Sequence, residues 1–379
     1  MKKAGIITIQ KSSNYGACLQ CYALYKYVES LGYNCEIIDL HRPGVKHQKY
    51  RASKRFVPSR YSIKKVIIER IKKLCGKNIE QNYPRSAIRM DKIHNFNERM
   101  KYSQPYVSPD DLYDNPPVYD IYISGSDQLW NPTMSFCLEP YFLTFAPNDA
   151  VKISYATSIG ISNLKEKEKY DYKRWLSGYT YISVREKSAR DLLSSFIKTP
   201  LEQVPDPSFL LTKREWQSIS IDPKIGKPYI LLFTLEFSES LLQYVNRLKI
   251  ESGLEVVYLC WRQPVEPLDY IAERDAGIEE FLGYIRNASL VITNSFHGSV
   301  FSIILETRNF FSFVGGSKRG SRIVDLLSQF NLGDHLLDNN LCQTYGDLSK
   351  LIVNHDEIQE LIHKERDRAC DFLRKALPC

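Results

Sequence analysis

The chain has 379 residues, of which 43% are hydrophobic, 25% charged and 12% aromatic. These fractions are typical of a folded globular protein and exclude a disordered one. The 51 Lys and Arg exceed the 44 Asp and Glu, so the formal net charge is +7. A mild excess of this kind gives no support to nucleic-acid binding, which needs concentrated basic patches. At roughly 150 residues per domain, the length predicts two domains, each with its own core.

Neither a membrane span nor a signal peptide is predicted. The longest purely apolar runs, such as Ile230–Phe233 and Leu290–Ile292, are far shorter than the ~20 residues of a spanning helix. The N-terminal apolar run is too short for a signal peptide and lacks a small-residue cleavage site after it. We therefore expect a cytoplasmic protein with free thiols. Cys18 and Cys21 form a C-x-x-C inside a predicted helix, with a redox or metal pair as the alternative.

The chain opens with a β-α-β pattern. Ile6–Gln10 is a predicted strand, Ala17–Leu31 a helix that ends at Gly32, and Cys35–Leu40 the next strand. The two strands should be parallel and joined by a right-handed crossover. The other elements expected in the first half are strands at Tyr119–Ser124, Lys152–Ala156 and Tyr179–Val184 and a helix at Ser188–Phe196.

Residues 41–105 differ from their surroundings, because they are rich in Lys, Arg and Tyr and weakly apolar. Helical periodicity recurs around Ile63–Leu74 and Ile88–Met100, which predicts a helical insertion in the first domain. The insertion is either a solvated cover or a surface for an acidic partner. Beside a membrane, its basic 46–77 stretch would contact anionic headgroups.

The second half repeats the alternation of strands and helices. Strands are expected at Tyr229–Thr234, Val256–Cys260, Leu290–Thr293 and Phe310–Val314, and helices at Ser238–Ser252, Glu279–Asn287, Ser299–Glu306, Ser321–Phe330 and Asp356–Leu373. Alternation in both halves predicts two α/β domains with parallel sheets. We place the domains at 1–205 and 228–355, separated by a proline-rich boundary. Residues 356–379 form a C-terminal helix that we expect to pack back towards the first domain.

Polar loops follow several predicted strands, where ligands of such folds bind. Ser12–Gly16 opens a helix whose free backbone N–H groups suit an anion or a sugar hydroxyl, with simple N-capping as the alternative. Ser124–Pro132 combines amides, the Asp127 carboxylate and the Trp130 indole. These groups suit a sugar, whereas the alternative is an Asx-turn beside a core tryptophan.

Two further loops carry groups suited to anions and to proton transfer. Arg185 follows a strand, and its planar donor fork fits a carboxylate or phosphate, unless it pairs with Glu186 or Asp206. His297 follows the strand Leu290–Thr293, beside Asn, Ser and Gly, where an imidazole that titrates near neutrality can serve as acid or base. A structural histidine is the alternative. We expect no metal site here, because no His or Cys occurs nearby at the spacing of metal ligands.

A glycine-rich loop over 315–322 adds three cations, Lys318, Arg319 and Arg322. Such a loop ahead of a helix forms an anion cradle, or else a solvated surface loop. Together the polar loops predict a small, strongly anionic substrate and a hydroxyl-rich one.

Five of these motifs, in this order, resemble the bacterial polysaccharide pyruvyl transferase family. They are Asn14–Ala17 with Leu19 and Gln20, Gly125–Asn131, Ser183–Glu186, Val204–Pro207 and Asn294–Gly298. The resemblance implies a GT-B-like arrangement of two Rossmann-like domains, acceptor side first and donor side second, with the active site between them. It also implies that phosphoenolpyruvate, the donor substrate, gives its enolpyruvyl group to a sugar hydroxyl pair, without a further cofactor or metal.

The resemblance assigns roles to residues at the matching positions. His297 and Arg185 match its histidine and its donor-binding arginine, and Asp127 is our candidate base. Phe296 stands where family members have arginine before the histidine, so donor binding depends more on the loop downstream. The expected donor-binding residues are Arg185, Asn294, Ser295, Lys318, Arg319 and Arg322. The expected acceptor-binding residues are Asn14, Tyr15, Gly16, Asp127, Gln128, Trp130 and Asn131.

Two other functions fit the same residues. One is a GT-B-type nucleotide-sugar glycosyltransferase, whose second-domain cations would hold a diphosphate. The other is a non-catalytic sugar-binding protein of the same fold. The acceptor is a sugar or a lipid-linked oligosaccharide, and a lipid-linked one would place the protein at the cytoplasmic face of the inner membrane.

Overall fold

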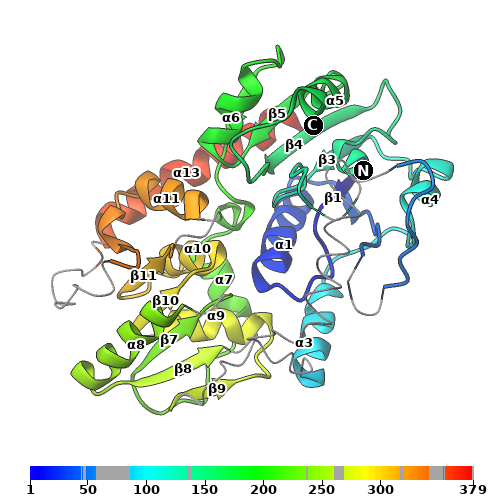
Figure 1. The fold of residues 1–379 in the computed structure, drawn as a ribbon. Coiled ribbons are helices and arrows are strands. Elements are labelled where there is room, and N and C mark those ends of the chain that lie inside the picture. The colour runs from blue at the N-terminus through cyan, green and yellow to red at the C-terminus, as the bar shows by residue number, and fades with distance from the viewer. Residues whose placement is uncertain are drawn as a thin grey trace, which may run out of the picture. The chain divides into compact units, whose positions relative to one another are not determined.

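The computed structural model describes residues 1–43, 45, 48–56, 86–134, 136, 138–235, 238–259, 269–315, 320–340, 353 and 355–377. By their contacts these residues fall into two compact units (Figure 1). The first comprises described residues within 1–75, 97–210 and 365–379, and the second those within 76–96 and 211–364. Each unit contains one six-stranded sheet.

The sheet of the first unit is parallel throughout, in the order β2-β1-β3-β4-β5-β6. Its strands are β1 (Lys3–Ile7), β2 (Asn34–Ile37), β3 (Ile121–Ser124), β4 (Val151–Thr157), β5 (Tyr181–Val184) and β6 (Leu201–Gln203). Its helices include α1 (Tyr15–Ser30), α4 (Pro109–Asp114), α5 (Glu166–Leu176) and α6 (Lys187–Ser194). The order is that of a doubly wound fold, and the parallel pairing of β1 with β2 confirms the predicted β-α-β opening.

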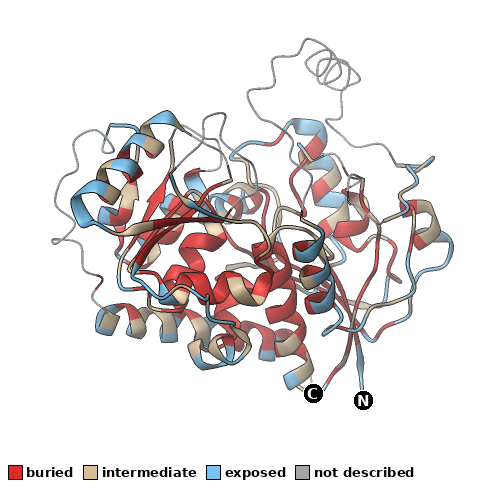
Figure 2. Ribbon diagram, turned by 90° about the horizontal axis from the view of Figure 1, so that it is seen from below, coloured by how far each residue is buried: buried red, intermediate tan, exposed pale blue. Residues whose placement is uncertain are grey.

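Helix α1 is buried on all sides from Tyr15 to Tyr25, and only its last turns reach solvent, at Lys26, Glu29 and Ser30 (Figure 2). The Asn14 side chain caps it by accepting the Ala17 N–H at 3.3 Å. Gly32, with φ at +87°, takes the left-handed conformation that ends it. The strand before it, β1, begins and ends three residues earlier than expected. Thr8–Gln10 therefore belong to the loop that follows β1.

The sheet of the second unit is also parallel, in the order β12-β11-β10-β7-β8-β9. Its strands are β7 (Tyr229–Phe233), β8 (Glu255–Leu259), β9 (Ile271–Glu273), β10 (Leu290–Thr293), β11 (Phe310–Phe313) and β12 (Leu336–Leu337). Its helices include α7 (Lys213–Ile219), α8 (Glu239–Ser252), α9 (Ile278–Asn287), α10 (Phe296–Ile304) and α11 (Gly320–Gln329). Counted within the unit, this is the Rossmann strand order. The predicted class, two Rossmann-like α/β domains with parallel sheets, is confirmed.

Helix α3 (Ala87–Asn97) confirms the helix expected around Ile88–Met100. By contacts its residues up to Phe96 belong to the second unit, whereas the sequence predicts the whole insertion in the first domain. A hydrogen bond from Ser86 to Asp275 and an ion pair of 2.5 Å from Lys92 to Glu280 attach this segment there. The helix expected over 63–74 lies outside the described residues.

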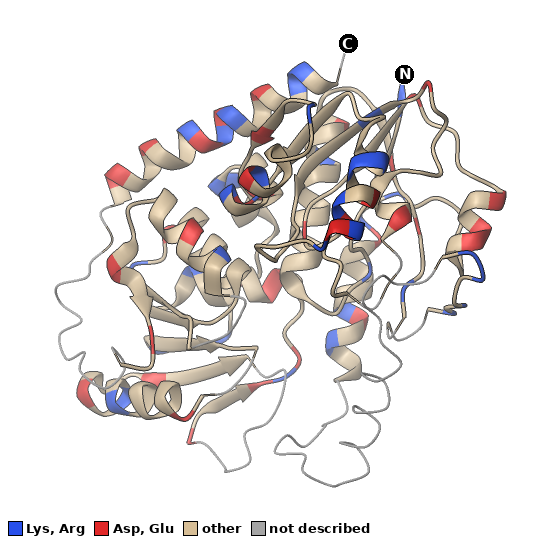
Figure 3. Ribbon diagram, turned by 45° about the horizontal axis from the view of Figure 1, so that its top comes forward, with Lys and Arg blue, Asp and Glu red and all other residues tan. Residues whose placement is uncertain are grey.

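The long C-terminal helix α13 (His355–Ala376) carries acidic and basic residues along its length (Figure 3). Residues from Glu365 onward belong to the first unit. There the Phe372 ring lies 6.2 Å from that of Tyr155, and Arg366 Nε donates to the Leu210 carbonyl at 3.3 Å.

His335 is a buried histidine next to β12. Its ring stacks on Phe310 with the centroids 5.0 Å apart, and its Nδ1 lies 2.7 Å from the Phe310 carbonyl oxygen. Because a carbonyl can only accept, Nδ1 carries the proton in this contact. Burial lowers the pKa of His335 below its usual value of 6.5, although the Phe310 carbonyl and Asp334 oppose the shift.

The lowered pKa of His335 makes stability depend on pH. The unfolded imidazole binds a proton more readily than the folded one, so its contribution is present above pH ~6.5 and is lost as pH falls through the lower folded pKa. We expect the free energy of unfolding, from urea titrations at about pH 5 to 7, to fall more steeply with acidification in the wild type than in His335→Gln. Equal slopes in the two proteins would contradict this assignment.

Candidate active site

Each sheet reverses its strand order at one point, and predicted site residues lie in the loops there. In the first unit the reversal lies between β1 and β3, whose following loops contain Ser12–Gly16 and Gly125–Asn131. In the second unit it lies between β7 and β10, and Asn294–Gly298 follows β10. Ligands of open α/β sheets bind outside the carboxyl ends of strands at such a point. The topology of each unit therefore supports the predicted loops as binding elements.

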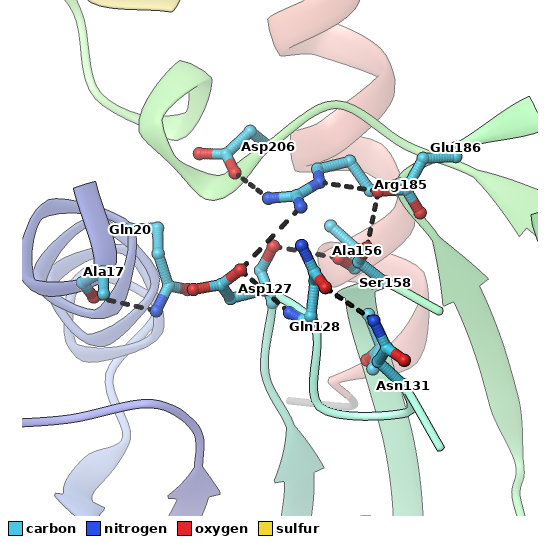
Figure 4. A network of polar contacts seen from close by, with 12 residues as sticks. Ala17, Gln20, Asp127, Gln128, Asn131, Ala156, Ser158, Arg185, Glu186 and Asp206 are labelled. Atoms are coloured by element: carbon cyan, nitrogen blue, oxygen red, sulfur yellow. Dashed lines mark hydrogen bonds and ion pairs between the residues drawn. The ribbon is translucent and has the colours of Figure 1, made fainter. Parts of the chain in front are cut away.

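Arg185 is the centre of a buried charge cluster in the first unit (Figure 4). Its Nη1 lies 2.8 Å from Asp206 Oδ2, its Nε 3.2 Å from Glu186 Oε1, and its Nη2 4.0 Å from Asp127 Oδ1. Burial by itself lowers the pKa of Arg185, but the carboxylates of Glu186, Asp206 and Asp127 more than offset this and raise it overall. The guanidinium is thus charged and surrounded by carboxylates.

The members of this cluster differ in how far solvent reaches them. The side chain of Asp127 is 18% exposed, against 3% for Arg185, 5% for Glu186 and 0% for Asp206. Asp127 is therefore the carboxylate of the cluster that a substrate can approach. The pairing of Arg185 with Glu186 and Asp206 is the alternative that the sequence analysis left open, and it buries the guanidinium away from an incoming anion.

The backbone at Asp127 has a strained conformation that surrounding contacts hold in place. Asp127 has φ at +73° and Ala156 has φ at +50°, a region that non-glycine residues rarely adopt. Ala156 lies where β4 shifts register between Ser154 and Thr157, as in a β-bulge. The Ser158 N–H donates to the Asp127 carbonyl at 2.9 Å, and the Ser158 hydroxyl donates to Glu186 Oε1 at 2.6 Å. Strain that is held by surrounding contacts is typical of functional sites.

Two buried polar side chains outside the predicted site, Thr8 and Gln20, connect α1 to the Asp127 loop. The Thr8 hydroxyl donates to the Ser126 carbonyl at 3.1 Å and accepts from Gln20 Nε2 at 3.2 Å. Gln20 Nε2 also donates to the Ala17 carbonyl at 2.9 Å, so the amide orientation of Gln20 is fixed. The sequence signal for Gln20 is its place in the first of the five motifs.

Trp130 corrects the expectation that its indole stacks on a sugar. The side chain is fully buried, its ring stacks on Phe142 with the centroids 4.8 Å apart, and its Nε1 donates to the Tyr141 carbonyl at 3.0 Å. It is the core tryptophan of the alternative interpretation. Tyr15 is likewise buried within α1, and Asn131 is buried with its Nδ2 donating to Gln128 Oε1 at 2.6 Å.

The other expected acceptor residues lie at the start of α1 and in the Asp127 loop. Asn14 is partly exposed and caps α1, which uses its side-chain oxygen. Gly16 is buried in the first turn of the helix. Gln128 is partly exposed beside Asp127, whose Oδ1 accepts the Gln128 N–H at 2.8 Å. Gln128 and Asp127 are therefore the members of this set best placed to meet a ligand.

His297 is the second residue of α10, which begins three residues earlier than expected and so includes it. Ser295 caps the helix by accepting the Gly298 N–H at 3.4 Å. Asn294 Oδ1 accepts the Leu235 N–H at 2.7 Å, which joins the loops after β7 and β10. A Cβ at Gly298 would lie 2.3 Å from the Thr293 hydroxyl oxygen, so the helix can begin here because residue 298 is glycine.

One of the three expected cations lies beside this histidine loop. Arg322, in the first turn of α11, has its Cζ 5.7 Å from the centre of the Phe296 ring. The Phe296 ring in turn meets the His297 ring edge-on, with the centroids 5.2 Å apart. Lys318 and Arg319 lie outside the described residues.

Over the described ranges, no group of three or more His, Cys, Asp or Glu could hold a metal ion. In the same part of the chain, no helix is long and apolar enough to cross a membrane. Cys18 and Cys21 are buried in α1, and neither is part of a disulfide.

A family model described as polysaccharide pyruvyl transferase matches residues 14–311. This range contains all five motifs that carry the resemblance. The chain belongs to the polysaccharide pyruvyl transferase family. The match confirms the resemblance that the sequence motifs indicated, and the family is one of transferases.

The chain is also similar to solved structures of sugar-nucleotide enzymes. One is UDP-GlcNAc 2-epimerase from Methanocaldococcus jannaschii, with 10% identity over 97% of this chain and 93% of that one, at a TM-score of 0.48. Another is UDP-GlcNAc 2-epimerase from Neisseria meningitidis bound to UDP-GlcNAc, with 11% identity over 100% of this chain and 99% of that one, also at 0.48. A search of curated proteins found no match.

The burial of Arg185 makes a prediction that separates a structural from a purely donor-binding role. Arg185→Met leaves Glu186, Asp206 and Asp127 without their cation, and removing one partner of a buried ion pair costs about 3–5 kcal/mol. We expect that loss in the free energy of unfolding, measured by urea titration. Arg190→Met, which removes a solvent-exposed partner of Asp191, is the matched control and should cost roughly 0–1 kcal/mol. Wild-type stability in Arg185→Met would contradict the structural role.

Proposed function

We propose that the protein transfers the enolpyruvyl group of phosphoenolpyruvate to two hydroxyls of a sugar during cell-surface polysaccharide biosynthesis. The products are a cyclic pyruvate ketal and phosphate. Membership of the family supports the transferase activity. The observation that carries the finer proposal is the placement of two groups at the points where the sheets reverse order. The candidate base, Asp127, lies in the loop after β3, and the candidate acid, His297, lies in the first turn of α10 after β10.

His297 acts as the general acid in this proposal. Its protonated imidazole gives a proton to the methylene carbon of phosphoenolpyruvate, which becomes a methyl group and leaves an oxocarbenium-like centre at C2. Arg322 holds an anionic group of the donor and stabilises the charge that develops on the leaving phosphate. Asn294 and Ser295 act through the loop, because their side-chain oxygens accept backbone N–H groups that fix its shape.

Asp127 acts as the general base for the sugar. It takes the proton of the first hydroxyl as that oxygen attacks C2. The second hydroxyl then attacks C2, the C–O bond to phosphate breaks, and phosphate leaves with the bonding electron pair. Of the two hydroxyl protons, one replaces the proton that His297 gave to carbon and the other leaves with phosphate, so atoms and charge balance.

Arg185 supports Asp127 rather than meeting the donor directly. Its Nη2 lies 4.0 Å from Asp127 Oδ1, and its Nη1 and Nε are engaged by Asp206 and Glu186. A direct contact with the donor, which the resemblance implies, is disfavoured because the guanidinium is buried and two of its nitrogens already bind buried carboxylates. The geometry therefore favours a positioning role for Arg185 and leaves Gln128 and Asp127 as the groups that meet the sugar.

The acid role of His297 predicts a large loss of turnover without loss of fold. His297→Ala should lower phosphate release from phosphoenolpyruvate, with a sugar acceptor present, by about 10²–10⁴-fold. His363→Ala, in an exposed position on α13, is the control and should keep wild-type turnover. Circular dichroism should show both variants folded. Near-normal turnover in His297→Ala would rule out this residue as the acid.

A further inference from the structure

We propose that Phe296 is a positioning residue whose ring holds the Arg322 guanidinium beside His297, where that guanidinium binds the anionic donor. The inference rests on the proposed function, because it concerns binding of phosphoenolpyruvate. It assigns a role to the residue directly before the candidate acid, a phenylalanine whose side chain can neither transfer a proton nor donate a hydrogen bond.

The contact between the two residues supports this role. Phe296 is the first residue of α10 and is only partly buried, whereas the residues that follow it in the helix are buried. The Cζ of Arg322 lies 5.7 Å from the centre of its ring, within the distance at which an aromatic quadrupole attracts a cation. The partly exposed ring therefore has a cation as its neighbour on the same surface.

The topology explains why this cation reaches the histidine loop. Strands β10 and β11 are parallel neighbours, with Val291 paired to Phe310. Helix α10 follows β10 and α11 follows β11, so both helices begin at the same carboxyl edge of the sheet. Arg322 on α11 consequently reaches the Phe296 ring, which also meets the His297 ring edge-on.

The chemistry of arginine suits such an arrangement. A guanidinium can interact with an aromatic ring and still donate its N–H groups to a carboxylate or phosphate, both of which phosphoenolpyruvate carries. Another cation–π contact of this unit, in which the Arg247 Cζ lies 5.3 Å from the centre of the Tyr244 ring, lies within a single helix, α8. The Phe296–Arg322 contact instead joins two helices at the edge where the candidate acid lies.

A double-mutant cycle on the full chain tests the proposal. The variants are Phe296→Leu, Phe296→Tyr, Arg322→Met and the double variant Phe296→Leu/Arg322→Met, with Tyr170→Leu on an exposed face of α5 as the control. Calorimetry measures the Kd for phosphoenolpyruvate, and phosphate release with a sugar acceptor gives KM and kcat. Inorganic phosphate is titrated as a second anion. If Phe296→Leu loses its fold by circular dichroism, Phe296→Met takes its place.

We expect Phe296→Leu to raise the Kd and KM for phosphoenolpyruvate roughly two- to five-fold, with kcat changed less than about two-fold. Phe296→Tyr keeps the ring and should restore values near wild type, and Arg322→Met should raise Kd about ten-fold or more. Because Phe296 acts through Arg322, the double variant should bind no more weakly than Arg322→Met alone.

Two results would overturn the positioning role while leaving the proposed function intact. Both apply when the wild-type protein binds phosphoenolpyruvate. The first is a double variant whose Kd rises by the product of the two single increases, and the second is a Phe296→Tyr variant that binds as weakly as Phe296→Leu. A wild-type protein that neither binds phosphoenolpyruvate nor releases phosphate from it would overturn the proposed function, and this inference with it.

Discussion

A guanidinium buried among three carboxylates organises the carboxyl edge of the first sheet. Asp127, Arg185 and Asp206 come from the loops after β3, β5 and β6, so one cation joins three separate chain segments. A buried charge is tolerated when it is paired and hydrogen-bonded, and Asp206 is further held by the Ser208 N–H and hydroxyl at 3.0 and 2.7 Å. The cluster therefore fixes the conformation of these three loops and leaves Asp127 as its most exposed carboxylate.

The second sheet reaches a comparable result by different means. Its candidate acid lies at the start of a helix, and the loop before that helix is fixed by Asn294, Ser295 and the close approach of Gly298 to Thr293. Here the constraint is steric and hydrogen-bonded rather than ionic. In both units the strand order brings the loops together, and local polar contacts then orient the reacting groups.

The alternation of strands and helices could be read from the sequence, because buried parallel strands are continuous apolar runs separated by periodic helices. Helix α5 was missed, since it is mostly charged and presents few apolar residues, with Tyr172 and Leu176 among its buried positions. The short edge strands β6, β9 and β12 were missed because they carry too few residues to form a pattern.

The candidate loops were also predictable, because polar residues directly after strands mark the carboxyl edge of such sheets. Which side chains face solvent was not predictable, since burial depends on partners far away in the sequence. Trp130 is covered by Phe142, and Arg185 is paired with Asp206. The Phe296–Arg322 contact likewise joins residues from different helices, and no local pattern of sequence indicates it.

The central claim is that the chain transfers a pyruvyl group after protonation of the donor carbon. The most direct test is to run the reaction with phosphoenolpyruvate and a panel of galactose-, mannose- and glucosamine-type acceptors in D₂O, and to examine the product by mass spectrometry and NMR. The account predicts phosphate release and a sugar ketal whose methyl group carries a single deuterium taken from solvent. A ketal methyl without deuterium, or release of UDP from UDP-sugars with no phosphate released from phosphoenolpyruvate, would contradict it.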